Sequence, residues 1–327
     1  MNEEIPNSEI LLVYEAKMCN PNGDPDAENK PRIDTKTNVN LVSDVRLKRF
    51  FRDYIVDNFG EEHVYVTKIA GESVRADTRV KKLLSLDEQK INEVLNEQKI
   101  NEVLNKCIDA RLFGATIPIG KGGGRGASKS FIGPLQFTWG FSLHAVELVD
   151  SSAITSVFSG REVAESYGTM GRDWRIYYSL IGFYGVVSGR RAKGTGMTMT
   201  DLKVFDNLIW TALQVQPTTR SKIGEMPHLY LRIEYKNAGT VLGDLRKFVT
   251  VKPRRDTIRD FSDLEINFDR LTDHIKRNAD VISKVFMMTS EELSYVRDLV
   301  KSCYPERFSA LPHEMTAAEV EAAIKRT

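Results

Sequence analysis

The sequence predicts an α+β fold in which strands and helices are interleaved. Apolar, β-branched runs at residues 9–18 and 176–187 predict buried strands, and apolar residues recur at helical spacing after Ser43 and Thr198. The spacing of these elements is βαβ-like in places, with long insertions between them, which favours α+β over a barrel or a helix bundle. The chain has 327 residues, of which 41% are hydrophobic, so it can bury a sizeable core.

The first strand and the first helix are the clearest elements. Residues 9–18 lead into residues 19–26, which are rich in Asn, Pro, Gly and Asp and predict a turn or loop. A helix then begins after Ser43, its N-cap, and ends before Gly60. Its apolar stripe consists of Leu47, Phe50, Phe51, Tyr54 and Ile55. On the opposite, solvent-facing side we expect the cations Lys48, Arg49 and Arg52.

A direct duplication lies within the next helical segment, residues 83–112. Residues 88–96 and residues 97–105 have identical sequences. Nine residues at ~100° each turn a helix through two and a half turns, so the two copies cannot bury the same face of a straight helix. We therefore interpret the duplication as a peripheral insertion, and we expect deletion of residues 97–105 to leave folding and ligand binding nearly unchanged.

A Gly-rich basic loop follows at residues 120–126. It contains Lys121 and Arg125, and Lys129 directly precedes a strand-like segment at residues 130–139. The loop does not match the nucleotide-binding pattern GxxxxGK[ST]. Free backbone N–H groups beside cations nevertheless suit a phosphate, and the alternative is an ordinary flexible surface loop.

The second half of the chain alternates strands and helices. A basic turn at residues 189–194, with Arg190 and Arg191, follows the aromatic strand, and Thr198 caps the next helix. Residues 229–235 alternate apolar and polar and predict another strand. The remainder combines amphipathic helices with a basic stretch that includes Arg254 and Arg255.

Charge is unevenly distributed along the chain. The sequence has 46 Lys and Arg against 45 Asp and Glu, a net charge of +1. Four windows, residues 30–52, 111–129, 170–193 and 246–259, are each strongly basic, so the rest of the chain is acidic. If folding joins these windows, they form a continuous positive track of the kind that binds a polyanion. The alternative is an ordinary solvated surface.

Catalytic and metal-binding motifs are not evident in the sequence. The five His residues occur singly, the three Cys residues lie far apart, and no nucleophile elbow is present. Asp24 and Asp26 could hold a divalent cation, although Asp in such a loop more often satisfies its own backbone. The acidic N-terminus and the lack of a long apolar run predict a soluble, cytoplasmic protein without membrane contact.

Several sequence blocks resemble a known family. Residues 20–26 (NPNGDPD), 31–34 (PRID) and 43–52 (SDVRLKRFFR) are similar to the backbone subunit of the type I CRISPR interference complex, Cascade, most of all in its I-B and I-C branches. Looser similarity follows in the same order at residues 111–114, 133–136 and 169–172, so the resemblance spans roughly residues 9–213.

The resemblance implies a single hand-shaped domain over residues 1–327, of the repeat-associated mysterious protein (RAMP) superfamily. Its palm would be a modified RNA-recognition-motif sheet, which is ferredoxin-like, with helical fingers at residues 60–110 and an extended thumb at residues 150–178. Copies would polymerise head to tail along one CRISPR guide RNA and present it to a target DNA strand in antiviral defence. The other implied partners are the large, small, guide-processing and 5′-handle-binding subunits, and transiently a helicase-nuclease.

The residues that we expect to contact RNA combine the basic windows with the family's positions. The helix at residues 43–52 would grip guide phosphates, Met170 or Trp174 would wedge a flipped base, and Arg172 would hold an adjacent phosphate. The full set is Asn22, Arg32, Ser43, Arg46, Lys48, Arg49, Arg52, Lys121, Arg125, Lys129, Met170, Arg172, Trp174, Arg175, Arg190, Arg191, Arg254 and Arg255.

No cofactor, metal or catalytic residue is implied, because the family's processing nuclease is a separate subunit. Two alternatives remain open at this stage. One is a metal-dependent ribonuclease of the same superfamily that uses Asp24 or Asp26. The other is a general single-stranded RNA-binding module without a role in CRISPR defence.

Overall fold

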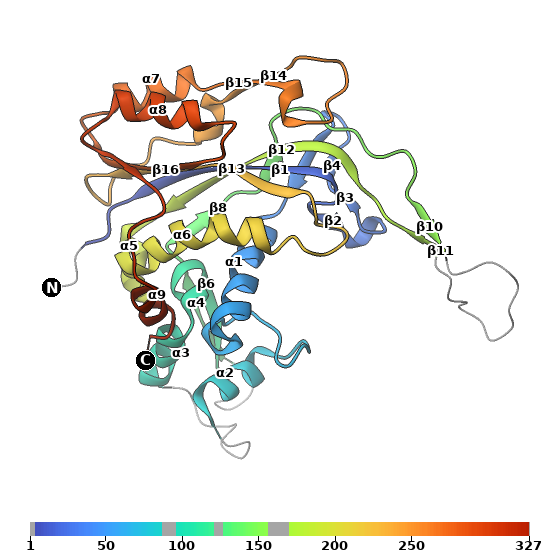
Figure 1. The fold of residues 1–327 in the computed structure, drawn as a ribbon. Helices are drawn as coiled ribbons and strands as arrows, with labels where there is room; N and C mark the ends of the chain where they lie inside the picture. Colours follow the sequence, from blue (N-terminus) through green and yellow to red (C-terminus); the bar gives the residue numbers. More distant parts are fainter. Residues whose placement is uncertain (1–3, 87–95, 121–126, 156–169, 327) are drawn as a thin grey trace, which may run out of the picture.

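A mixed β-sheet forms the centre of the computed structural model, which describes residues 4–86, 96–120, 127–155 and 170–326 (Figure 1). Within these ranges the sheet has nine strands in the order β17–β16–β13–β1–β12–β9–β5–β4, with β8 also paired to β12. Only the β16–β17 pair is parallel among the described pairs of this sheet. The strands are β1 (Ser8–Cys19), β4 (Ile33–Asp34), β5 (Val39–Val42), β8 (Leu135–Phe137), β9 (Gly140–Ser142), β12 (Ile176–Val187), β13 (Glu225–Tyr235), β16 (Ile282–Thr289) and β17 (Phe308–Ala310).

The sheet is covered by helices on both faces (Figure 1). α1 (Asp44–Phe59) and α6 (Met199–Val215) pack on one face, whereas α7 (Asp269–Arg277) and α8 (Ser294–Cys303) cover the other. Along β1, Leu12 and Tyr14 enter the first core and Leu11 and Val13 enter the second. Burial on both faces explains why the predicted strand is an apolar run without alternation.

Both predicted helix starts are confirmed. The Ser43 Oγ accepts a hydrogen bond from the Arg46 N–H at the start of α1, and Gly60 follows its end with φ +110°. Thr198 and Asp201 form a reciprocal capping box at the start of α6. These signals depend on residues three or four positions apart, so they can be recognised from sequence alone.

A third core lies beneath α1 and contains part of the duplication. It is formed by α2 (Ala76–Leu84), α3 (Glu97–Lys106), α4 (Ile108–Phe113) and the hairpin of β6 (Gly114–Gly120) and β7 (Ala127–Ile132). The second copy of the duplicated sequence forms α3, in which Ile100, Val103 and Leu104 are buried. Its interpretation as peripheral is therefore wrong. Residues 88–95 of the first copy lie outside the described residues.

Three predicted elements differ from the structure. The helix predicted over residues 83–112 is divided into α2, α3 and α4, with extended backbone at Cys107 between the last two. The segment 130–139 is split at Gly133, where a side chain would collide with the backbone of Phe113. The predicted basic turn at residues 189–194 is a short helix, α5 (Gly189–Thr195), whose Gly189 packs directly on the backbone of Ile5.

Smaller elements complete the chain. β2 (Gly23–Asp24) pairs with β3 (Lys30–Pro31) around a 3-10 turn, and β14 (Thr250–Pro253) pairs with β15 (Leu264–Asn267). β10 (Ala153–Thr155) and β11 (Met170–Arg172) form a ribbon that projects from the sheet, on the right in Figure 1. α9 (Ala317–Ile324) ends the chain beside α6. Within the described ranges, no helix combines the length and the apolar character of a membrane span.

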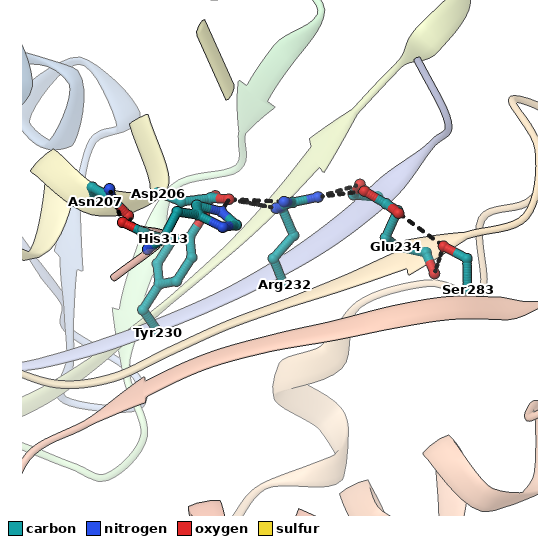
Figure 2. Close-up of polar contacts among 8 residues, drawn as sticks. Asp206, Asn207, Tyr230, Arg232, Glu234, Ser283 and His313 are labelled. Carbon is teal, nitrogen blue, oxygen red and sulfur yellow. Dashed lines mark hydrogen bonds and ion pairs between the residues drawn. The ribbon is translucent and has the colours of Figure 1, made fainter. Parts of the chain in front are cut away.

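A buried charge network, consisting of Asp206, Arg232, Glu234 and His313, ties α6, β13 and the C-terminal segment together (Figure 2). The Arg232 Nη2 lies 2.8 Å from the Asp206 Oδ2, and its Nη1 lies 3.2 Å from the Glu234 Oε2. The His313 Nε2 is 2.7 Å from the Asp206 Oδ2. The strand predicted over residues 229–235 is thus confirmed, but its polar face is buried in this network rather than solvated.

Candidate nucleic-acid interface

The loops at one end of the β1–β12 pair converge on the first turn of α1. We call this region the junction and define it as residues 18–32, 43–46, 172–175 and 218–225. Cys19 pairs with Ile176, and the Asn20 N–H donates to the Ser221 carbonyl at 2.8 Å. The Ser43 N–H donates to the Asn22 Oδ1 at 2.8 Å, so Asn22 fixes the loop after β1 against the helix.

Trp174 lies between two cations of the junction. The Lys30 Nζ lies 4.3 Å from the centre of the ring and the Arg172 guanidinium lies 5.7 Å from it. The Trp174 Nε1 is buried without a hydrogen-bond partner. Arg172 also pairs with Glu28 at 2.6 Å, and both of these side chains are more than half exposed. An aromatic ring beside the exposed Arg172 and the half-buried Lys30 suits a nucleic acid, because bases stack on rings and cations attract phosphates.

Arg32 occupies the other side of the loop. Its Nη1 lies 3.1 Å from the Asp24 Oδ2, and its guanidinium lies 5.7 Å from the centre of the Trp139 ring. The second carboxylate oxygen of Asp24 accepts the Asp26 N–H at 3.2 Å. Asp24 is therefore engaged in the turn and in an ion pair, as the turn interpretation of this loop predicts. No group of three or more potential metal ligands occurs among the residues that the structure describes.

Arg175 and Arg220 share one carboxylate. Asp173 lies 2.8 Å from Arg175 and 2.9 Å from Arg220, and the Arg175 Nη1 donates to the Met18 carbonyl at 2.6 Å. Although burial acts in the opposite direction, the hydrogen bonds from Arg220 and Arg175 lower the pKa of Asp173. Arg220 is 62% exposed and retains donors that face solvent. Arg220 follows α6 and lies in none of the basic windows, so the sequence did not identify it as a site residue. Lys30 and Trp139 were also not identified as site residues from the sequence.

Unsatisfied polar atoms gather beneath the first turn of α1. The Arg46 guanidinium lies 4.0 Å from the centre of the Phe50 ring, and its Nε is buried without a partner. Both carboxylate oxygens of Glu225 are likewise buried without partners. Burial raises the pKa of Glu225 to about 7 and lowers the pKa of the neighbouring Lys222 to about 8. Buried polar atoms normally have partners, so this part of the junction has hydrogen-bonding capacity left for a ligand or water.

The predicted cationic face of α1 is wrong for two of its three members. Arg52 is buried, and its Nε lies 2.8 Å from the Asp109 Oδ2. Lys48 is also buried, and its Nζ lies 2.9 Å from Asp44 and donates to the Gln136 Oε1 at 3.0 Å. Lys48 lies only about 20° from Ile55 around the helix at 100° per residue, so it flanks the apolar stripe. Arg52 lies about 60° from Ile55 and is buried by its contact with Asp109. Arg49 does face outward, is 39% exposed and pairs with Asp53.

The other predicted residues are dispersed or outside the described residues. Lys121 and Arg125 lie outside the described residues. For Met170 the structure describes the backbone, which lies in β11 opposite Thr155. Lys129 pairs with Glu97 at 3.4 Å on the β6–β7 hairpin. Arg254 and Arg255 lie exposed between β14 and β15, where Arg255 pairs with Asp263 at 3.3 Å.

The predicted continuous track is interrupted by the length of β12. Arg172 and Arg175 precede this 12-residue strand, whereas the exposed Arg190 and Arg191 follow it on α5 (Figure 1). At about 3.3 Å per residue the two groups are roughly 36 Å apart. The window at residues 170–193 therefore contributes to two separate surfaces. The structure brings together Asn22, Arg32, Ser43, Arg46, Arg172, Trp174 and Arg175 of the predicted set.

The fold and the junction together define an α+β protein with an edge that combines the Trp174 ring with seven cations and six carboxylates, an arrangement that can contact a nucleic acid. The family model of the CRISPR-associated protein Cas7 matches residues 6–269, and the chain is 31% identical over 295 residues to the CRISPR-associated protein Cas7 of Haloferax volcanii, with 86% of each chain covered. The chain therefore belongs to the Cas7 family, which confirms the resemblance drawn from its sequence.

Solved structures support the same fold. The chain is similar to a chain of a CRISPR RNA-guided surveillance complex, with a TM-score of 0.50, 13% identity, and 97% of this chain and 98% of the other covered. It is also similar to a chain of such a complex in a pre-nicking state, with a TM-score of 0.51, 12% identity, and 97% and 99% covered.

Proposed function

We propose that this Cas7 chain is the guide-RNA-binding backbone subunit of a type I interference complex and that the junction grips the guide. It would assemble head to tail with further copies, contact the other Cascade subunits, and present the guide to target DNA in the cytoplasm. The observation that carries this proposal is the Trp174 ring at the base of the β10–β11 ribbon, flanked by the half-buried Lys30 and the exposed Arg172. Such a surface recognises backbone and stacking rather than sequence.

The sheet topology supports a modified RNA-recognition-motif palm. Four neighbouring strands have the ferredoxin-like order, which is β13–β1–β12–β9. The two helices of that arrangement are α1, which follows β1 in the chain, and α6, which follows β12. Both faces of this sheet are covered by apolar cores, so neither face is free to stack bases. RNA would therefore bind at strand ends and loops, which is where the junction lies.

The fingers and thumb are assigned on the same basis. The helices within residues 60–110 pack around a core of their own, which supports a finger unit. The β10–β11 ribbon within residues 150–178 projects beyond the sheet and supports a thumb (Figure 1). A non-catalytic role is proposed for the loop after β1, because Asp24 is engaged by Arg32 and by its own turn.

The decisive experiment compares two variants with equal loss of charge. We expect Lys30→Gln/Arg172→Gln to weaken binding of all RNA sequences alike and to lower the salt slope by ~0.7 for each lost phosphate contact. Lys276→Gln/Lys301→Gln, which removes two exposed cations on α7 and α8, is the matched control and should keep nearly the wild-type slope. Affinity would be measured by fluorescence anisotropy at several salt concentrations. The proposal would be contradicted if the junction variant kept the wild-type affinity and salt slope, or if the two variants lost affinity equally.

The identity of the RNA is tested independently. We expect RNA that co-purifies with the full-length chain from its native cells to have the uniform length of a CRISPR guide. Sequencing and gel sizing would show this. RNA of mixed length and origin would instead favour a general single-stranded RNA-binding module.

A further inference from the structure

A second basic site lies away from the junction, between the finger helices and the C-terminus. A pocket of about 310 Å³ is lined by Glu61, Glu62, His63, Arg79, Lys82, Leu83, Ser85, Lys106, Lys325 and Arg326. Its volume is at the lower end of small-ligand sites. In Figure 1 the C-terminus lies beside α3, and the Arg111 Nη2 joins the two regions by donating to the Ala323 carbonyl at 2.6 Å.

The lining of this pocket has an excess of positive charge. It includes five cations and two carboxylates. Lys82 pairs with Glu61 of the lining at 2.5 Å. Lys106, Lys325 and Arg326 have acidic partners outside the lining, which are Glu102, Glu321 and Asp201. The pocket itself therefore retains cations that its own carboxylates do not balance.

Arg79 is the unusual member of the lining. It is 3% exposed, and its Nη2 donates to the Val64 carbonyl at 2.6 Å and to the Glu61 carbonyl. Among the described residues, no carboxylate lies within ion-pair distance of it, and its Nε is buried without a partner. The His63 Nδ1 is also buried without a partner. The hydrogen bond from Lys82, and to a smaller extent the charge of Arg79, lower the pKa of the Glu61 carboxyl, so Glu61 is a more distant counter-charge that pairs directly with Lys82. A buried cation without a close counter-ion is costly, so an anion bound in the pocket would stabilise Arg79.

We propose that this pocket binds a phosphate monoester group. A phosphate dianion is compact, carries three strong acceptor oxygens, and matches the planar donors of Arg together with the point charges of Lys. The group could belong to a small phosphorylated molecule or to the terminal phosphate of a nucleic acid. Neither source uses the junction, so this site and the guide-binding surface can be tested separately.

The test is isothermal titration calorimetry on the full-length, RNA-free chain at constant ionic strength. We expect inorganic phosphate and AMP to bind saturably at one site and adenosine not to bind. Lys325→Gln/Arg326→Gln should weaken the binding of phosphate and of AMP by at least tenfold. The control Lys276→Gln/Lys301→Gln removes two exposed cations on α7 and α8 and should leave both affinities unchanged. Absence of saturable phosphate binding, equal binding of AMP and adenosine, or equal effects of the two variants would overturn the proposal.

The source of the phosphate is resolved in the background of the junction variant Lys30→Gln/Arg172→Gln. A 5′-phosphorylated trinucleotide that binds at least tenfold more tightly than AMP and than its 5′-hydroxyl form would identify a nucleic-acid terminus. Equal affinity for AMP and the trinucleotide would identify a small phosphorylated molecule. Failure of guide binding in this background does not affect the result, because only affinity that depends on Lys325 and Arg326 is attributed to the pocket.

Discussion

The buried charge network and the junction use arginine in opposite ways. Arg232 is fully buried between two carboxylates and connects β13 with α6, whereas Arg172 is 58% exposed, lies over Trp174 and has one solvent-exposed partner. A buried pair that loses one member leaves an uncompensated charge, whereas an exposed pair contributes little to stability. The comparison shows that cations of this protein are divided between holding the fold and facing a ligand.

The same division occurs within one turn of α1. Arg52 is buried against Asp109, and Arg49 faces outward beside Asp53. Arg111 repeats the buried arrangement with Asp201. Because all three arginines lie in basic windows of the sequence, charge density alone does not identify the cations that are available to RNA.

The largest expected effect separates Arg52 from Arg49. We predict that Arg52→Ala lowers the free energy of unfolding by about 3–5 kcal/mol, because it leaves the buried Asp109 without its counter-ion. Arg49→Ala should change stability by less than about 1 kcal/mol. Urea unfolding followed by circular dichroism measures both. Similar effects for the two variants would refute the division between buried and exposed cations.

The buried charge network should also respond to acid. Although burial acts in the opposite direction, Arg232 and His313 lower the pKa of Asp206 below its ordinary value of 3.8, and Tyr230 also faces this carboxylate. A lowered folded-state pKa contributes stability that is present above pH 3.8 and is lost as the pH falls below it. The free energy of unfolding should therefore fall more steeply between pH 5 and pH 3 in the wild type than in Asp206→Asn. If the free energy of unfolding fell equally with pH in the wild type and in Asp206→Asn, Asp206 would not be the cause of the acid sensitivity.

Trp174 gives the sharpest test of the junction. We expect Trp174→Ala to weaken single-stranded RNA binding by about 1–3 kcal/mol if one base stacks on the ring. Stability should change much less, because the ring is partly exposed and contacts Lys30 and Arg172. Trp139→Ala, which removes the ring beside Arg32, is the matched comparison. If Trp174→Ala kept the wild-type affinity for single-stranded RNA, base stacking on this ring would be refuted and only the cations would remain as proposed RNA contacts.

The smallest effect is expected for the duplication, for a reason that the structure supplies. The two copies are identical, so deletion of residues 97–105 gives the same chain as deletion of residues 88–96, and the remaining copy can form α3. Asp87 would then replace Asn96 as the N-cap, and both residue types are good caps. We predict a change below about 1 kcal/mol in thermal or urea unfolding. Ile100→Ala, by contrast, should cost about 2–5 kcal/mol. Insoluble or unfolded deletion protein would contradict this explanation.

Local sequence signals predicted much of the fold. The bounds of β12 and α1 match the predicted segments, because an apolar run, an N-cap and a terminal glycine act over a few residues. The division of residues 130–139 at Gly133 was not predictable, since it depends on a close approach to Phe113. The family was also evident, because its blocks are contiguous in sequence.

What the sequence determined by itself was the position of β1, β12 and β13 and of α1 and α6, the N-caps of these two helices and the presence of excess cations in four windows. Only the tertiary structure decided which cations are structural and which line a surface. The partners of Arg52 and Arg111 lie 57 and 90 residues away, and Lys30 meets Trp174 from a distant part of the chain. Burial and pairing depend on such long-range contacts, and these set the energy of a charge far more than its neighbours in sequence do.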